Sequence, residues 1–164
     1  MKNTSNTTPK IIALLLCAAA GFAHASDSHS GEHSHGANET ALGRPGTAAK
    51  VTHTITVNMS DDMRFTPSAI QVDKNDTVRF IVKNKGQVKH ELSLGTEKDL
   101  LEHLEAMKKY PDMEHDEPGK VTLAPGKQGE IVWQFTRPGV VNFACLMPGH
   151  YEAGMKGLIK VAQK

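Results

Sequence analysis

Three side chains that can bind a metal lie within eleven residues near the end of the chain: Cys145, His150 and Met155. Thiolate and thioether sulfur atoms favour Cu(I), and imidazole is also a good ligand for copper. One cysteine, two histidines and a weak axial methionine make up the ligand set of a type 1 copper site. This loop therefore predicts copper that changes oxidation state, if another part of the chain supplies a second histidine.

The second histidine is expected to be His90, which lies fifty-five positions before Cys145. Two other chemistries would use part of the same set. A thiol–imidazole nucleophile pair could form from Cys145 and His150, but it leaves Met155 and His90 without a role. Zinc is the other alternative, and its usual ligands do not include methionine. We therefore expect one mononuclear copper site and no catalytic residues of the hydrolytic kind.

The start of the chain has the pattern of a secretory signal peptide. Lys2 and Lys10 form a basic region, residues 11–22 are apolar, and Ala23-His24-Ala25 is a small-x-small cleavage site. Twelve apolar residues are too few to cross a bilayer, which needs about 20. The pattern therefore predicts export to the periplasm, cleavage after residue 25 and no membrane insertion afterwards.

Cysteine usage supports the metal interpretation. The chain has two cysteines, and Cys17 would leave with the signal peptide. Leu16 stands before it where a lipoprotein signal would have a small residue, which argues against lipidation. The mature protein would keep only Cys145, and a free thiol is a liability in an oxidising compartment. A bound metal resolves this problem by holding the thiolate, although a buried, inert cysteine is the alternative.

The charges of the chain are balanced. It has 19 basic and 18 acidic residues, and loss of Lys2 and Lys10 with the signal peptide would leave 17 basic residues and a net charge of −1. This balance predicts no nucleic-acid partner and no strong attraction to membranes. The expected partners are copper ions and, in one interpretation, a redox protein, and the protein itself is expected to be a monomer.

The elements that must position these residues are mostly strands. Apolar and polar residues alternate from Val51 to Met59 with a period of two. Further strands are predicted at residues 69–72, 77–82, 90–94, 120–123, 130–135, 140–144 and 156–161. Residues 98–110 instead have apolar side chains at helical spacing, and Pro111 ends this segment. The pattern predicts an all-β Greek-key sandwich of about eight strands with one inserted α-helix, in which Ile131, Trp133 and Phe135 share a core-facing side.

Several motifs together resemble the cupredoxin family of type 1 copper proteins over about residues 51–164. They are Phe65-x-Pro67-x-x-Ile70-x-Val72, Asp76-Thr77-Val78-x-Phe80, His90, and Cys145-x-x-Pro148-Gly149-His150 followed by Met155. The resemblance implies that His90, Cys145 and His150 are equatorial copper ligands and that Met155 is the axial ligand. One departure concerns the residue after the first histidine, which is often asparagine in electron carriers of the family and is Glu91 here.

Other methionines and histidines suggest additional copper binding. Met59-x-Asp61-x-Met63-x-Phe65 and Met113-Glu114-His115 look like segments of periplasmic copper-tolerance cupredoxins. The candidates for a second site are Met59, Met63, Met113, His115 and Met147, since thioethers and imidazoles suit Cu(I). The alternative is that the methionines fill gaps in the core.

Residues 26–50 read as a disordered, histidine-rich linker between the signal peptide (1–25) and the cupredoxin domain (51–164). His29, His33 and His35 could bind copper, or the segment could be a solvated linker only.

Two physiological roles are consistent with the sequence. The first is copper tolerance, in which periplasmic copper is captured or oxidised with help from the additional histidines and methionines. The second is soluble electron carriage to a redox enzyme, with Leu146, Met147 and Pro148 as an apolar patch around His150.

Overall fold

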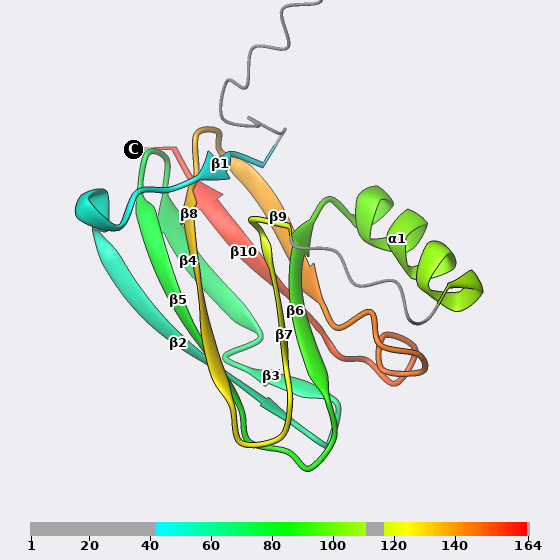
Figure 1. Ribbon diagram of the computed structural model, residues 1–164. Helices are drawn as coiled ribbons and strands as arrows, with labels where there is room; N and C mark the ends of the chain where they lie inside the picture. The colour runs from blue at the N-terminus through cyan, green and yellow to red at the C-terminus, as the bar shows by residue number, and fades with distance from the viewer. Residues whose placement is uncertain (1–41, 111–116, 164) are drawn as a thin grey trace, which may run out of the picture. The chain divides into compact units, whose positions relative to one another are not determined.

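Within residues 42–110 and 117–163, which the computed structural model describes, the chain forms ten strands and one α-helix (Figure 1). The strands are β1 (Arg44–Pro45), β2 (His53–Ser60), β3 (Arg64–Thr66), β4 (Ala69–Asp73), β5 (Thr77–Asn84), β6 (His90–Gly95), β7 (Lys120–Leu123), β8 (Gln128–Gln134), β9 (Gly139–Ala144) and β10 (Lys156–Ala162). The helix is α1 (Glu97–Lys109), and a short 3-10 turn covers Ala48–Lys50.

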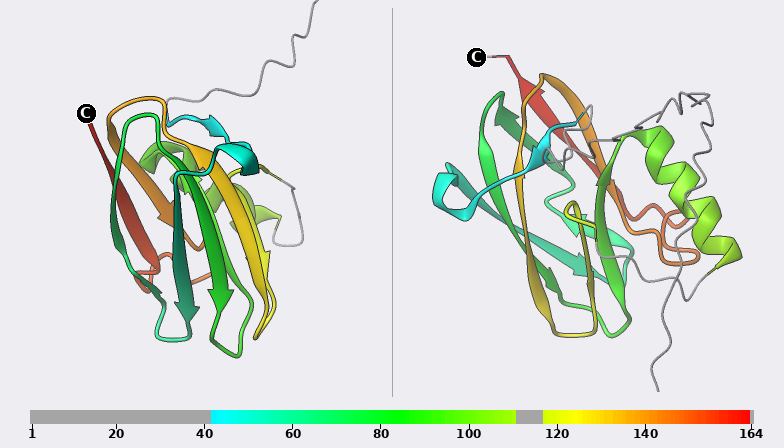
Figure 2. Two further views of the ribbon diagram at one scale, coloured as in Figure 1. Left: turned by 90° about the vertical axis from the view of Figure 1, so that its left-hand side faces the viewer. Right: turned by 45° about the horizontal axis from the view of Figure 1, so that its top comes forward.

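The strands form two five-stranded sheets, in the orders β1-β8-β5-β2-β3 and β4-β10-β9-β6-β7. Figure 2 shows these layers from two further directions. The pairs β2–β5 and β4–β10 are parallel, and all the other pairs are antiparallel. The mostly-β architecture with one helix confirms the predicted fold class.

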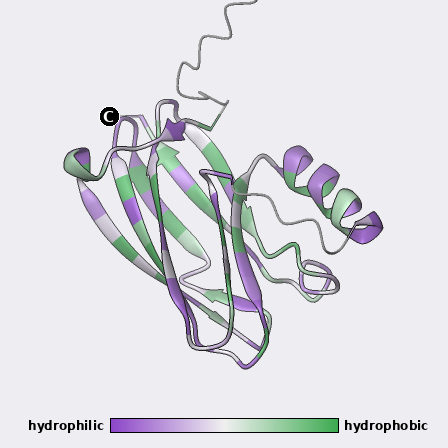
Figure 3. Cartoon of the chain, in the orientation of Figure 1, coloured by the Kyte–Doolittle hydropathy of each residue, from purple (hydrophilic) through white to green (hydrophobic). Residues whose placement is uncertain are grey.

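The core lies between the sheets. Ile131 and Trp133 on β8 and Phe135 just after it are 2%, 5% and 0% exposed, as their shared face predicted. Phe65 and Phe143 link the two sheets through an edge-to-face contact with ring centroids 5.0 Å apart. Apolar and polar residues alternate along the strands (Figure 3), because successive side chains of a strand point to opposite faces of the sheet.

Helix α1 covers the sheet close to the end of β9. Thr96 caps it in a capping box, since its hydroxyl accepts from the Asp99 amide and the Asp99 side chain accepts from the Thr96 amide. Leu100 and Leu104 are buried against Ala144, the residue before Cys145. The predicted helix is therefore confirmed within about one residue at each end, and it supports the segment that leads into the candidate metal loop.

The folded region begins earlier than the predicted boundary at residue 51. Leu42 is 8% exposed, its carbonyl accepts a hydrogen bond from the Trp133 indole at 3.4 Å, and β1 pairs with β8. A strand of two residues has no period by which it could be predicted, and the same applies to the three-residue β3. The predicted signal peptide and most of the predicted linker lie outside the described residues. Across 42–110 and 117–163, no helix is both long and apolar enough to cross a membrane.

Candidate metal centre

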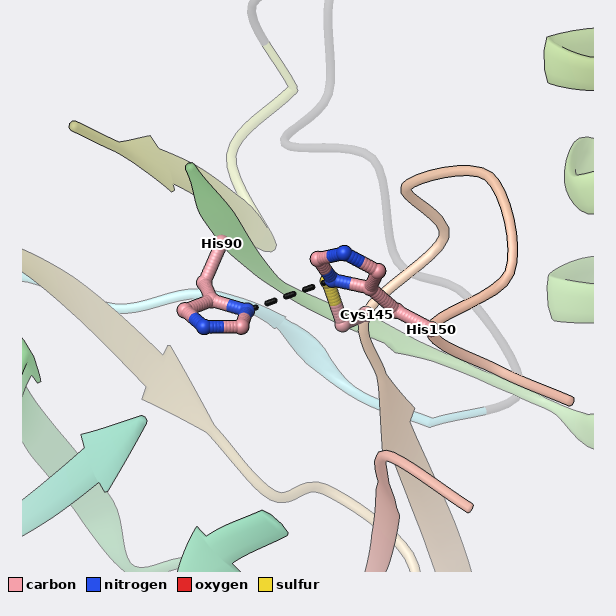
Figure 4. Close-up of side chains that lie close together, drawn as sticks. All are labelled: His90, Cys145 and His150. Atoms are coloured by element: carbon pink, nitrogen blue, oxygen red, sulfur yellow. Dashed lines mark hydrogen bonds between the residues drawn. The ribbon is translucent and has the colours of Figure 1, made fainter. Parts of the chain in front are cut away.

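Three segments of the sandwich bring the predicted histidines and cysteine together. His90 is the first residue of β6, Cys145 follows β9 directly, and His150 lies in the loop between β9 and β10. Strands β6 and β9 are antiparallel neighbours, so the start of one strand lies near the end of the other. Figure 4 shows the three side chains directed toward one another.

The donor atoms of these side chains are spaced for one metal ion. Nδ1 of His150 lies 3.2 Å from Nδ1 of His90 and 3.3 Å from Sγ of Cys145. Each residue offers a ligand atom within 4.8 Å of the others, and no other group of three His, Cys, Asp or Glu among the described residues is so placed. Metal bonds of about 2.0 Å to nitrogen and about 2.3 Å to sulfur, as for zinc, separate neighbouring donors by about 3–4 Å. A type 1 copper ion therefore fits this cluster.

Backbone hydrogen bonds fold the loop back so that Met155 returns to Cys145. The amide of Cys145 donates to the Met155 carbonyl, and the amide of Met155 donates to the His150 carbonyl, both at 3.0 Å. Gly149 has a φ of 84°, a left-handed conformation that glycine adopts without strain. Met155 is completely buried, and its backbone lies directly beside both residues; its role as the axial ligand stays a prediction.

The sulfur atom of Cys145 belongs to a fully buried side chain. The residue is 0% exposed, and the backbone amide of Glu91 donates to Sγ at 3.3 Å. Burial raises the pKa of the Cys145 thiol from 9.0 to about 11, because the charged thiolate is poorly solvated there. The copper-free protein therefore holds a neutral thiol at pH 7, and metal binding must release its proton.

The copper-free protein is expected to lose stability as the pH rises from 9 towards 11. The unfolded thiol ionises near 9.0, whereas the buried thiol keeps its proton until about 11. Between these values the unfolded state binds fewer protons than the folded state, so the free energy of unfolding decreases. Lysines titrate in the same pH range. The measurement is therefore the difference in the free energy of unfolding between wild type and Cys145→Ser, determined by urea unfolding at pH 9 and at pH 11. An equal loss in the two proteins would contradict this assignment.

His150 is the more accessible of the two histidines. It is half-buried, whereas His90 is 0% exposed. Burial, and secondly the neighbouring His90 ring, lower the pKa of His150 below its usual 6.5. The imidazole is therefore neutral at pH 7 and can offer a lone pair to a metal.

A carboxylate that we did not predict as part of the site contacts His90. Oδ1 of Asp61 lies 3.0 Å from Nε2 of His90, on the opposite side of the ring from the cluster. Hydrogen bonds from the Gln87 amide, and secondly from His90, lower the pKa of Asp61. Asp61 lies between Met59 and Met63, which the sequence suggested as copper ligands, and it is 29 positions from His90. No local spacing could have indicated this contact.

Glu91 is buried next to the site. Glu91 is 2% exposed. Its Oε2 accepts a hydrogen bond from the Thr122 hydroxyl at 3.1 Å, and Nζ of Lys120 lies 3.6 Å from the same oxygen. Its Oε1 has no hydrogen-bond partner among the described residues. The position directly after His90 thus carries a buried ion pair.

The residues predicted for a second copper site are placed differently. Met59 is 0% exposed in the core, and Met63 and Met147 are half-buried and pack against that core. Their thioethers thus have packing roles. Met113, His115, His29, His33 and His35 lie outside the described residues. A second copper site therefore stays a prediction.

Comparison with known proteins agrees with this geometry. Residues 49–162 match the model of the family described as copper binding proteins, plastocyanin/azurin family. The chain belongs to this family. The predicted cupredoxin relationship is thereby confirmed, and so is copper as the cofactor that the cluster fits.

Relatives of the chain include two proteins named copper-resistant cuproprotein CopI. The one from Rubrivivax gelatinosus is 49% identical over 156 residues, which are 90% of this chain and 94% of the relative. The one from Vibrio cholerae is 37% identical, with 88% and 92% covered.

Solved structures of cupredoxins share the fold of this family member. Auracyanin B matches with a TM-score of 0.60 and 24% identity, over 77% of this chain and 98% of its own. An azurin from Methylomonas sp. strain J matches with a TM-score of 0.53 and 18% identity, over 68% and 99%. At these identities the structural comparisons support the fold alone.

Proposed function

We propose that this protein is an exported, mononuclear type 1 copper protein that protects its cell against copper. The observation that carries the proposal is the cluster of His90, Cys145 and His150 on neighbouring strands and their loop. The names of the CopI relatives support copper tolerance as the role. We assign His90, Cys145 and His150 as equatorial ligands and Met155 as the axial ligand. Copper supplies one-electron chemistry between Cu(I) and Cu(II) when it is bound.

The chain's own contribution is to hold the donor atoms in place. His90 is fixed by its position on β6, and Cys145 by the end of β9 and by the Glu91 amide at 3.3 Å from its sulfur. The Met155 amide bond to the His150 carbonyl at 3.0 Å closes the loop. Because these contacts lie within the chain itself, we expect the donor atoms to stay in place when the charge of the site changes.

The remaining predictions about its setting belong to the same proposal. The basic, apolar and small-x-small pattern of residues 1–25 supports export to the periplasm. Oxidation of Cu(I) as part of tolerance is consistent with a redox-active site. The histidines of residues 26–35 would add weak copper capture.

Soluble electron carriage is the second candidate, and the exposure around His150 favours it. Pro148 and Gly149 are exposed and Met147 is half-buried, so a partner could approach this side of the loop. Leu146 does not contribute, because it is 1% exposed and packs with Leu100 and Leu104 of α1. The predicted apolar patch is therefore smaller than the sequence suggested.

Growth in high copper separates the two roles. A strain that lacks the protein is complemented with wild type, with Cys145→Ser, and with His29, His33 and His35 changed to alanine. If tolerance is the role, Cys145→Ser should lose most of the protection. The tail variant should lose part of it with an unchanged visible spectrum, because its histidines are not equatorial ligands.

His53→Gln is the matched control for this experiment, since His53 pairs with Asp76 at 3.3 Å and lies outside the cluster. All variants must be present at wild-type levels. Full copper tolerance of Cys145→Ser, together with impaired respiration, would refute tolerance and favour electron carriage.

A further inference from the structure

We propose that Asp61 is a positioning residue of the copper site, whose carboxylate fixes the tautomer of His90 and favours Cu(II) over Cu(I). The inference rests on the proposed role of His90 as a ligand. It adds a residue from the turn between β2 and β3, which belongs to neither of the segments that supply the four proposed ligands.

The contacts of the His90 ring determine which nitrogen carries the proton. An ionised carboxylate only accepts hydrogen bonds, and a neutral imidazole has one N–H group. With Oδ1 of Asp61 3.0 Å from Nε2, the proton therefore lies on Nε2. Nδ1, which is 3.2 Å from Nδ1 of His150, then presents its lone pair to the cluster. His90 is completely buried, whereas the Asp61 side chain is 39% exposed, so the bond is closed to water on the imidazole side only.

The carboxylate of Asp61 is itself held from the other side. The backbone amide of Gln87 donates to Oδ2 of Asp61 at 2.7 Å. The backbone amide of Val88 donates more weakly to Oδ1 at 3.4 Å. A Cβ atom at Gly86 would collide with this carboxylate. The loop between β5 and β6, which leads directly into His90, is thus built around the Asp61 side chain.

The charge of Asp61 should matter in addition to its hydrogen bond. Carboxylate partners of metal-bound histidines raise the basicity of the ligand and fix its orientation. A nearby negative charge also stabilises Cu(II), which carries one more positive charge than Cu(I). His150 has no such partner among its described hydrogen bonds. The two histidines should therefore be unequal ligands, with His90 the stronger donor.

A purely structural role for Asp61 makes different predictions. If the side chain only connects the two loops, its replacement should lower stability without changing the relative affinity for Cu(II) and Cu(I). If it positions and polarises His90, the reduction potential must shift. Asp62 offers a matched control in the same turn, since it is exposed and accepts from the Ser60 hydroxyl.

The test compares Asp61→Asn with Asp62→Asn in the copper-loaded full chain. Asparagine is isosteric but cannot accept from both His90 and Gln87, because one of its two groups is a donor. Copper binding should weaken about 10- to 100-fold in Asp61→Asn, with the larger loss for Cu(II). A tenfold excess loss for Cu(II) corresponds to a potential about 59 mV higher. Asp62→Asn should match wild type in affinity and potential.

A second measurement does not depend on any variant. In the copper-free wild-type chain, nitrogen NMR shifts of His90 should show the Nε2–H tautomer. The Nδ1–H tautomer, or an Asp61→Asn protein with unchanged potential and affinity, would overturn the inference. Failure of the proposed function would look different. In that case wild type would not bind copper as a type 1 site, or His90→Ala would keep the type 1 spectrum, whatever residue stands at position 61.

Discussion

Cys145→Ser is expected to abolish the intense visible colour of the copper-loaded protein while leaving the fold intact. The colour of a type 1 site comes from charge transfer between the thiolate sulfur and copper, and Cys145 is the only cysteine within residues 26–164. Serine is slightly smaller, so it fits the buried position, and its oxygen can still accept from the Glu91 amide. Absorption spectra of the copper-loaded proteins and circular dichroism of both forms are the measurements.

The matched control for colour is His53→Gln, which changes a histidine outside the cluster and should keep the full visible band. If Cys145→Ser remains coloured, Cys145 is not the copper ligand and the assignment of the site is wrong. If it is colourless and also unfolded, its circular dichroism will show this directly. A folded, colourless variant is the outcome that the structure predicts.

Lys120→Met is expected to destabilise the copper-free protein by about 3 kcal/mol, the lower end of the range for a broken buried ion pair. The Lys120 side chain is 6% exposed and that of Glu91 is 2% exposed, so the substitution leaves a carboxylate buried without a counter-charge. The lower end applies because the N–O distance is 3.6 Å. Urea unfolding of the two proteins measures the difference.

Two further variants test whether the loss of stability in Lys120→Met comes from the buried charge of Glu91. Lys98→Met breaks the exposed pair with Glu102 on α1 and should cost much less stability than Lys120→Met, because water screens an exposed ion pair. The double variant Glu91→Gln/Lys120→Met removes both charges and keeps an acceptor for Thr122, so it should recover most of the stability. Equal losses of stability in Lys120→Met and Lys98→Met would contradict this prediction, because they would show that Glu91 does not need Lys120 as a buried counter-charge.

The local periodicity of the sequence was sufficient to predict several strands of the sandwich. Alternating residues in β2 and β8 mark a sheet with one buried face, and this property depends only on neighbouring positions. The loop residues Cys145, His150 and Met155 are close in sequence, so their types alone indicated copper. His90 required the additional expectation that a second histidine must come from elsewhere. In the structure, His90 lies beside this loop.

Contacts between distant segments were decided by the tertiary structure alone. Asp61 contacts His90, Lys120 pairs with Glu91, and Leu146 packs against α1. No spacing in the sequence relates these positions to one another. The same holds for Met59, whose thioether suits copper by type but is enclosed by the packed sheets. Side-chain chemistry states what a residue can bind. Burial and the partners that packing brings near decide which of those abilities the folded protein can use.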